Sequence, residues 1–225
     1  MDNIDNLKPH LKILHKRRIK MDGIIFDVDG TLWDSTYTAA TAWNEAVKEF
    51  GNLNVNITAD LLKQEFGKPM DVIISDVFPM LGKKDQNEIL EVICKWEHIM
   101  LNKLGGIPLG NIKDTFEELA KRHDLYIVSN CQLGYIELVM KYFGIENLVK
   151  DHLCFGETGT SKGQTILKLM EKNDIKDPVY VGDTDGDHNA CKEAEIPFVF
   201  AKYGFGSTEN PDYTIERFEE LTEMF

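Results

Sequence analysis

The chain has 225 residues, of which 43% are hydrophobic, and a formal net charge of −13 at pH 7. This length suffices for one globular domain, or for a core with a small inserted unit. The negative charge argues against nucleic acid and anionic membranes as partners, because both attract positive surfaces. No uncharged apolar stretch approaches the roughly 18 residues that a membrane helix needs, and the N-terminus has no apolar signal segment.

Residues 1–20 differ from the rest of the chain in charge. They carry six basic and two acidic side chains, a net +4 in a chain that totals −13. We expect a basic N-terminal extension without a catalytic role, with the first strand beginning near Met21. A basic helix that binds a membrane or a partner is the alternative interpretation.

The first strand is expected to end in two acids. The apolar run at residues 24–26 is typical of a buried parallel strand, and Asp27-Val28-Asp29-Gly30-Thr31 follows it. Side chains two residues apart in an extended chain point to the same side, so Asp27 and Asp29 converge just past the strand end. Two carboxylates at one point repel each other unless a cation lies between them, which favours a metal site.

Residues 36–105 are predicted to be all helical. Ser35 is a plausible N-cap for a helix over 38–50, and Gly51 ends that helix. Thr58 can cap a second helix, which breaks at residues 67–69. Helices over 70–78 and 83–104 follow, the last with apolar residues at helical spacing.

From residue 106 onward, strands and helices alternate. We expect helices over 114–122, 134–143, 164–172, 187–194 and 215–224, and strands over 125–128, 153–155, 179–181 and 198–200. This alternation predicts an α/β fold with a doubly wound, Rossmann-like parallel sheet. The strand before the helical block must join the same sheet. Residues 21–35 and 106–225 would then form the core, and 36–105 an inserted all-α cap over the carboxyl ends of the strands.

Polar residues follow later strands of this expected sheet. Ser129 and Asn130 end the second strand, where a hydroxyl and backbone amides suit a phosphate oxygen. Lys162 begins a helix, a position that the helix dipole disfavours unless an anion is near. Three acids within residues 183–187 follow the fourth strand and favour a hard divalent cation. Each site also has an ordinary explanation, as a helix cap, a surface lysine or an acidic turn.

Together, these sites resemble the four motifs of the haloacid dehalogenase-like superfamily in order and spacing. Asp27 and Asp29 match motif I, Ser129 motif II, Lys162 motif III, and Asp183 with Asp187 motif IV. The helical insertion is similar to the C1 cap of the phosphoglycolate phosphatase-like subfamily, and the resemblance extends from Met21 to the C-terminus. Trp33 and Gly163 depart from the usual pattern, and neither position touches the chemistry.

The resemblance implies a Mg²⁺-dependent phosphatase, since most members of the superfamily are phosphatases. Asp27 would form an aspartyl-phosphate, and Asp29 would act as acid and then base. The substrate would be bound by Ser129, Asn130, Lys162, Thr31 and Lys68. Mg²⁺ would be held by Asp27, the backbone carbonyl of Asp29, and Asp183, while Asp187 would position Asp183 or Lys162.

Four alternative functions share parts of this pattern. A dehalogenase needs no acid at position 29, and a receiver-type signalling domain has no helical insertion and carries its acceptor on another strand. A phosphomutase of the β-phosphoglucomutase type shares every motif and stays open, as does a non-catalytic phosphate-binding module on the same fold.

The substrate is chosen by the cap, and the sequence narrows it only through Lys68. This lysine lies in the break between two cap helices, where its ammonium could meet an anionic leaving group. On that interpretation the substrates are small phosphorylated metabolites such as phosphoglycolate, pyrophosphate or sugar phosphates. The four cysteines, Cys94, Cys131, Cys154 and Cys191, have no paired or zinc-like spacing and predict a cytoplasmic protein. The sequence makes no prediction of the oligomeric state.

Overall fold

The structure, a computed structural model, describes residues 21–51 and 53–225; the extension expected over residues 1–20 lies outside this range. A six-stranded sheet forms its centre, with the strand order β5-β4-β1-β6-β7-β8 and every neighbouring pair parallel. The strands are β1 (Gly23–Phe26), β4 (Asp124–Ser129), β5 (Val149–Cys154), β6 (Pro178–Gly182), β7 (Phe198–Ala201) and β8 (Tyr213–Ile215). The predicted α/β parallel-sheet fold is therefore confirmed.

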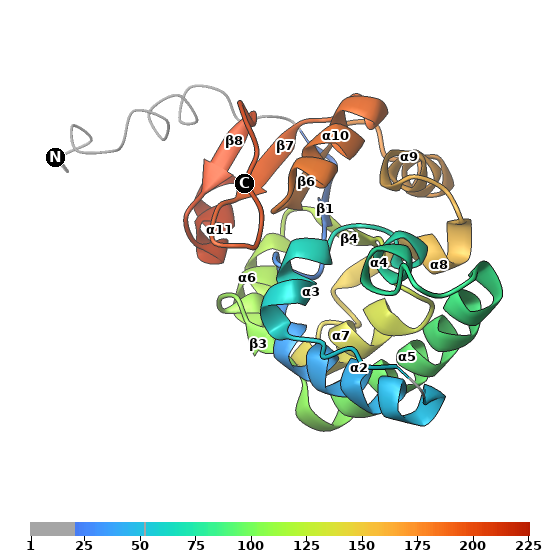
Figure 1. Ribbon diagram of the computed structural model, residues 1–225. Helices are drawn as coiled ribbons and strands as arrows, with labels where there is room; N and C mark the ends of the chain where they lie inside the picture. Colours follow the sequence, from blue (N-terminus) through green and yellow to red (C-terminus); the bar gives the residue numbers. More distant parts are fainter. Residues whose placement is uncertain (1–20, 52) are drawn as a thin grey trace, which may run out of the picture.

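Helices cover both faces of the sheet (Figure 1). Because side chains alternate along a strand, Ile24 and Phe26 of β1 pack in the cluster on one face, and Ile25 packs in the cluster on the other. The first cluster includes residues of α6 (Ile112–Leu119), α7 (Tyr135–Phe143), η2 (Phe218–Glu220) and α11 (Leu221–Met224). The second includes residues of α9 (Lys162–Asn173) and α10 (Asp185–Ala194), and the short α8 (Phe155–Thr158) follows β5. β1 is thus buried from both sides.

Four of the helices between β1 and β4 pack around a hydrophobic core of their own, which is separate from the two clusters on the faces of the sheet. They are α2 (Thr36–Phe50), α3 (Ala59–Glu65), α4 (Met70–Val77) and α5 (Lys83–Leu104). Their cluster includes Trp43 and Phe78, whose rings stack 6.2 Å apart. Figure 1 shows these helices gathered beside the sheet rather than on its strands. The chain leaves the sheet through β2 (Trp33–Asp34) and returns to it through β3 (Ile107–Pro108). These two short strands pair with each other as an antiparallel ribbon.

The C-terminal segment differs from the sequence prediction. A single helix over 215–224 is wrong: residues 213–215 form β8, which pairs with β7, and only a 3₁₀ turn and the four-residue α11 follow. Ile215 is fully buried beside Ala201, so its burial in the sheet outweighs any local helical tendency. The ribbon β2–β3 and helix α8 were also absent from the prediction, because elements of two to four residues carry too little periodicity.

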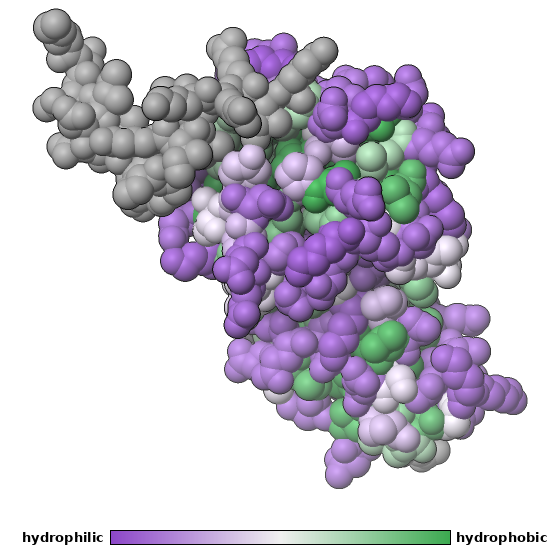
Figure 2. All heavy atoms as spheres, turned by 90° about the horizontal axis from the view of Figure 1, so that it is seen from above, coloured by the Kyte–Doolittle hydropathy of each residue, from purple (hydrophilic) through white to green (hydrophobic). Residues whose placement is uncertain are grey.

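The face of the molecule in Figure 2 is largely hydrophilic, and its apolar residues lie in small separate patches. No helix within residues 21–51 and 53–225 is long and apolar enough to cross a membrane. The four cysteines are free, and three of them are buried.

Phe218 tests how far the C-terminal segment supports the core. Its fully buried ring lies 5.9 Å from Phe26 and 6.1 Å from Phe116. Phe218→Ala should lower the free energy of unfolding by about 3–5 kcal/mol, measured by urea denaturation. Leu133→Ala, at a site that is 64% exposed, should change it by less than about 0.5 kcal/mol. Similar losses in the two variants would contradict this packing.

Candidate active site

The parallel strands bring three predicted site residues to one edge of the sheet. Asp27 follows β1, Ser129 ends β4, and Asp183 follows β6, and β1 lies between the other two strands in the sheet. The backbone N–H of Asp27 still donates to the Val181 carbonyl at 2.9 Å, so the strand holds this residue in place. All three side chains are buried. The carboxyl ends of parallel strands are where α/β folds place their sites.

Gly30 allows the turn after β1 to approach Asp183. Its φ is +82°, in the left-handed region that glycine adopts without strain. A Cβ at this position would lie 2.1 Å from Asp183 Oδ2, so any other residue would displace the carboxylate. The glycine of the Asp-x-Asp-Gly-Thr string is therefore required by both backbone conformation and space.

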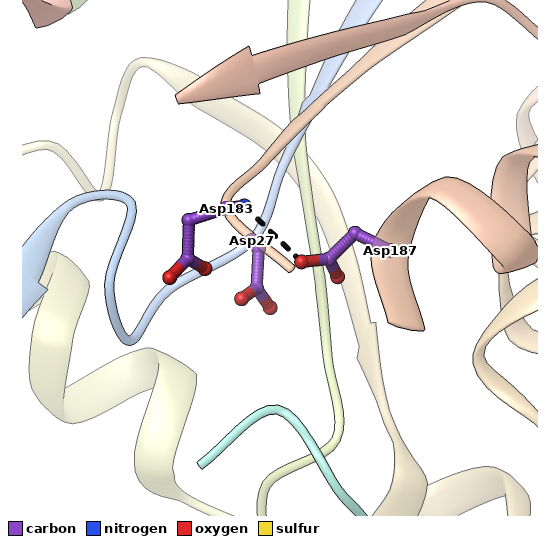
Figure 3. Close-up of side chains that lie close together, drawn as sticks. All are labelled: Asp27, Asp183 and Asp187. Atoms are coloured by element: carbon purple, nitrogen blue, oxygen red, sulfur yellow. Dashed lines mark hydrogen bonds between the residues drawn. The ribbon is translucent and has the colours of Figure 1, made fainter. Parts of the chain in front are cut away.

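Three carboxylates, Asp27, Asp183 and Asp187, meet within this edge. One oxygen from each lies within 4.8 Å of the others, and Figure 3 shows them converging from three different segments. Lys162 Nζ lies 2.9 Å from Asp27 Oδ1 and 2.5 Å from Asp187 Oδ1, and it is buried too. Three carboxylates and one ammonium leave a formal charge of −2 in the interior, which a divalent cation would balance.

Asp183 has the free ligand atom that such a cation needs. Its Oδ2 accepts a 2.7 Å hydrogen bond from the Phe205 N–H, while Oδ1 is buried and has no hydrogen-bond partner among the described residues. Burial, and then the charges of Asp187 and Asp27, raise the pKa of Asp183 well above its usual range. An unpaired buried carboxylate oxygen is costly, and a hard cation would satisfy it. The donor set therefore fits Mg²⁺.

In contrast to Asp183, both carboxylate oxygens of Asp187 have hydrogen-bond partners. Its Oδ2 accepts hydrogen bonds from the Asp183 N–H, the Thr184 N–H and the Thr184 hydroxyl, at 3.2, 3.0 and 2.7 Å. The Thr184 hydroxyl in turn accepts from the Asp187 N–H, which makes a capping box at the start of α10. With Oδ1 on Lys162, Asp187 fixes both the loop that carries Asp183 and the lysine.

Asp29 is bound by two hydroxyls that the sequence did not indicate. Ser35 Oγ donates to Asp29 Oδ1 at 2.5 Å, and the buried Tyr135 hydroxyl donates to the same oxygen at 2.8 Å. Ser35 does precede α2, as expected of a cap, but its side chain makes no capping bond. Loss of solvent raises the pKa of Asp29 to about 7, although both hydroxyls lower it. The carboxyl group can therefore hold or release a proton near neutral pH.

Ser129 and Asn130 lie where β4 ends, on the wall of a cavity that also touches Asp27 and Asp29. Asn130 Nδ2 donates to the Gly67 carbonyl at 2.7 Å, so this residue ties the helical insertion to the core. Lys68 lines the same cavity, but its Nζ pairs with Glu65 at 2.6 Å and Asp76 at 2.9 Å. Thr31 is fully buried and is not on the cavity wall.

The cavity lies between the strand ends and the helical insertion. Its volume of about 30 Å³ is enough for a few water molecules. The described residues that line it are Asp27, Asp29, Phe66, Gly67, Lys68, Met70, Ile73, Glu97, Ser129, Asn130, Cys131, Gln132 and Tyr135. A wider groove of about 710 Å³ adjoins it and shares the segment 66–68 and Asn130.

Glu97 is a buried acid that sequence reasoning missed. It projects from α5, is 2% exposed, and accepts hydrogen bonds from Trp43 Nε1 at 2.5 Å and Gln132 Nε2 at 2.7 Å. Burial raises its pKa to about 7. A signal was present, since Glu97 lies four residues from Ile93 and four from Leu101 and so falls within the apolar stripe of the helix.

Comparison with known proteins identifies the family. The model of the haloacid dehalogenase-like hydrolases matches residues 24–201, and the chain belongs to this family. The sequence-based assignment is confirmed, and the chain is a hydrolase of the phosphatase class.

The similar proteins include two curated enzymes and many solved structures. Phosphoglycolate phosphatase of Aquifex aeolicus is 30% identical over 212 residues, covering 89% of this chain and 95% of that one. Glyceraldehyde 3-phosphate phosphatase of Methanocaldococcus jannaschii is 28% identical over 224 residues, covering 90% and 96%. A haloacid dehalogenase-like hydrolase from Streptococcus pneumoniae superposes with a TM-score of 0.77 at 21% identity, covering 90% and 97%, and shares the fold.

The buried charge of Glu97 predicts a dependence of stability on pH. Its pKa rises from 4.5 to about 7 on folding, so the folded state binds more protons between these values. The free energy of unfolding should therefore fall as pH rises through this range. Glu97→Gln removes this pH-dependent loss. The gain in free energy of unfolding of this variant over the wild type should therefore be larger at pH 8 than at pH 5, by up to about 3 kcal/mol. Urea denaturation at both pH values measures the difference.

Glu49→Gln is the matched control. Glu49 also accepts a hydrogen bond from a tryptophan, Trp96, but it lies at the surface. Its substitution should not reproduce this pH-dependent gain. A gain from Glu97→Gln that is equal at pH 5 and pH 8 would contradict the assignment.

Proposed function

We propose that this protein is a Mg²⁺-dependent phosphatase that hydrolyses small phosphorylated metabolites through an aspartyl-phosphate intermediate. Phosphoglycolate, pyrophosphate and sugar phosphates are the candidate substrates. One observation carries the proposal: Asp27 lies in a buried cluster of charge −2, two residues from an acid whose pKa is about 7. The names of the relatives, phosphatases of phosphoglycolate and of glyceraldehyde 3-phosphate, support a small monoester as substrate.

The side chains of Asp27 and Asp183, with the backbone carbonyl of Asp29, would hold the metal ion. The unpaired Oδ1 of Asp183 supports this assignment, while both oxygens of Asp187 are already engaged. When bound, Mg²⁺ supplies positive charge that lets an anionic phosphate approach the carboxylates. We also place the enzyme in the cytoplasm, where its free thiols stay reduced.

Each protein residue then has a defined task. A carboxylate oxygen of Asp27 attacks phosphorus, and the bond from phosphorus to the leaving oxygen breaks. Asp29 gives its proton to that oxygen and later takes one from the water that attacks the aspartyl-phosphate. Lys162 and Ser129 hold the phosphoryl oxygens. Ser35 and Tyr135 hold the Asp29 carboxyl in one orientation.

Residues 36–105 would act as a cap that opens and closes. The segment 66–68 lines both the cavity and the adjoining groove, so its movement would widen the path by which a substrate reaches Asp27. The hydrogen bond from Asn130 to Gly67 would break and re-form in each cycle. Closure over the strand ends excludes water, and it admits a small leaving group but no folded protein.

Metal dependence is the first test. Hydrolysis of p-nitrophenyl phosphate should stop in excess chelator and return with Mg²⁺. Ca²⁺ should not restore it, because in-line transfer needs the tighter octahedral site. Full activity in excess chelator would disprove the metal assignment.

The two motif I acids should differ in their defects. Asp27→Asn should abolish turnover, because a carboxamide is no nucleophile. Asp29→Asn should still allow some phosphoenzyme to form from an ester with a good leaving group, but its hydrolysis should be slow. Rapid quenching with labelled substrate measures the intermediate. Label on any residue other than Asp27 would overturn the mechanism.

A further inference from the structure

We propose that Glu97 selects the leaving group of the substrate, favouring one that presents a hydroxyl and no negative charge, as in polyol and sugar phosphates, over a carboxylate. This inference rests on the proposed phosphatase function and narrows its substrate class. It would disfavour phosphoglycolate, whose leaving group carries a carboxylate.

Glu97 is placed to meet the leaving group. It comes from the cap, whereas Asp27 and Asp29 come from the core, and all three line one cavity. Tyr135, whose hydroxyl donates to Asp29, lines the same cavity, so Glu97 shares it with the proton donor and its hydrogen-bond partner. A substrate with its phosphorus at Asp27 and its leaving oxygen at Asp29 extends toward the cap, and Glu97 is the buried acid on that wall.

The carboxylate has room for another hydrogen bond. Trp43 Nε1 donates to Oε1, and Gln132 Nε2 donates to Oε2. Each oxygen has two lone pairs, so one acceptor site on each stays available for a donor on the substrate. Because one neighbour belongs to the cap and the other to the core, the two bonds hold the carboxylate in a fixed position in the closed state.

The charges around the cavity disfavour an anionic leaving group. Lys68 is the one basic side chain among the described residues that line it, and two cap carboxylates, Glu65 and Asp76, already pair with its ammonium. Lys162 is held by Asp27 and Asp187. Above pH 7, where Glu97 is ionised, a carboxylate on the leaving group would thus meet a negative charge without a compensating cation. Like charges in a desolvated site reject a ligand strongly.

Burying this acid brings no evident structural gain. A glutamine could keep both hydrogen bonds, through its oxygen to Trp43 and its amide to a rotated Gln132, without the cost of a buried charge. Costly charges that persist in a cleft are typical of binding and catalysis. The competing explanation is a structural one, in which Glu97 only joins cap to core. The experiment must therefore distinguish an effect of the negative charge of Glu97 from an effect of its contacts between cap and core.

A matched pair of esters makes this separation. Phosphoglycolate and 2-hydroxyethyl phosphate share a two-carbon leaving group and differ in a carboxylate against a hydroxymethyl group. p-Nitrophenyl phosphate reports the chemistry with neither group present. The full chain with Mg²⁺ is assayed for kcat and KM on all three esters at pH 8, where Glu97 carries its charge, as wild type, Glu97→Gln and Glu49→Gln. Glu49 is the control, since it is a cap glutamate bonded to Trp96 outside the cavity.

Wild type should favour 2-hydroxyethyl phosphate over phosphoglycolate at least about tenfold in kcat/KM. Glu97→Gln should lower that ratio at least about tenfold, mainly by lowering KM for phosphoglycolate. Its kcat on p-nitrophenyl phosphate measures any change in the chemical step, which affects both alkyl esters alike and cancels in their ratio. Glu49→Gln should keep the wild-type ratio.

A ratio unchanged by Glu97→Gln, or a wild-type preference for phosphoglycolate, would overturn this inference while leaving the phosphatase proposal intact. Absence of turnover with all three esters would overturn both.

Discussion

The structure depends on one electrostatic constraint, the burial of three carboxylates with a single ammonium. Asp27, Asp183 and Asp187 have no more than 2% exposure, and within the described part of the chain Lys162 is the one cation that forms ion pairs with this group, to Asp27 and Asp187. A buried charge without a compensating partner strongly destabilises a protein, because it loses its hydration. Hydrogen bonds and ion pairs hold both oxygens of Asp187, one oxygen of Asp27 and one of Asp183. Asp183 Oδ1 is buried without a hydrogen-bond partner among the described residues. That oxygen indicates where a cation belongs.

Several features of the fold bring these buried charges together and hold them in place. Neighbouring parallel strands place Asp27 and Asp183 at one edge, and Gly30 lets the turn after β1 approach Asp183. Asp187 caps α10 with one oxygen and holds Lys162 with the other, so the helix start and the charge network stabilise each other. The helical insertion contacts this edge of the sheet through the bond between Asn130 and Gly67. Sheet, turn and helical insertion are therefore parts of one arrangement.

The sequence predicts what short-range rules determine. Asp27 and Asp29 follow a recognisable strand, and strand alternation placed Ser129 and Asp183 beside them. The contacts of Tyr135 and Glu97 became visible only in the structure, because they join segments 106 and 35 residues apart. The sequence marks Glu97 only as an acid within the apolar stripe of its helix, and Ser35 only as a helix cap. Their local sequence suits a helix cap or an apolar helix face equally well. The terminal strand β8 was missed for the same reason, since its pairing with β7 decides its conformation.

The central claim is that the buried cluster holds one divalent cation, and calorimetric titration of the metal-free protein with Mg²⁺ tests it most directly. The account predicts one ion per chain and at least about tenfold weaker binding in Asp183→Asn, the loss of about 1.4 kcal/mol or more. Asp185→Asn, which changes an exposed acid at the start of α10, should bind as the wild type does. No binding to the wild type, or equal affinity in Asp183→Asn, would contradict the account.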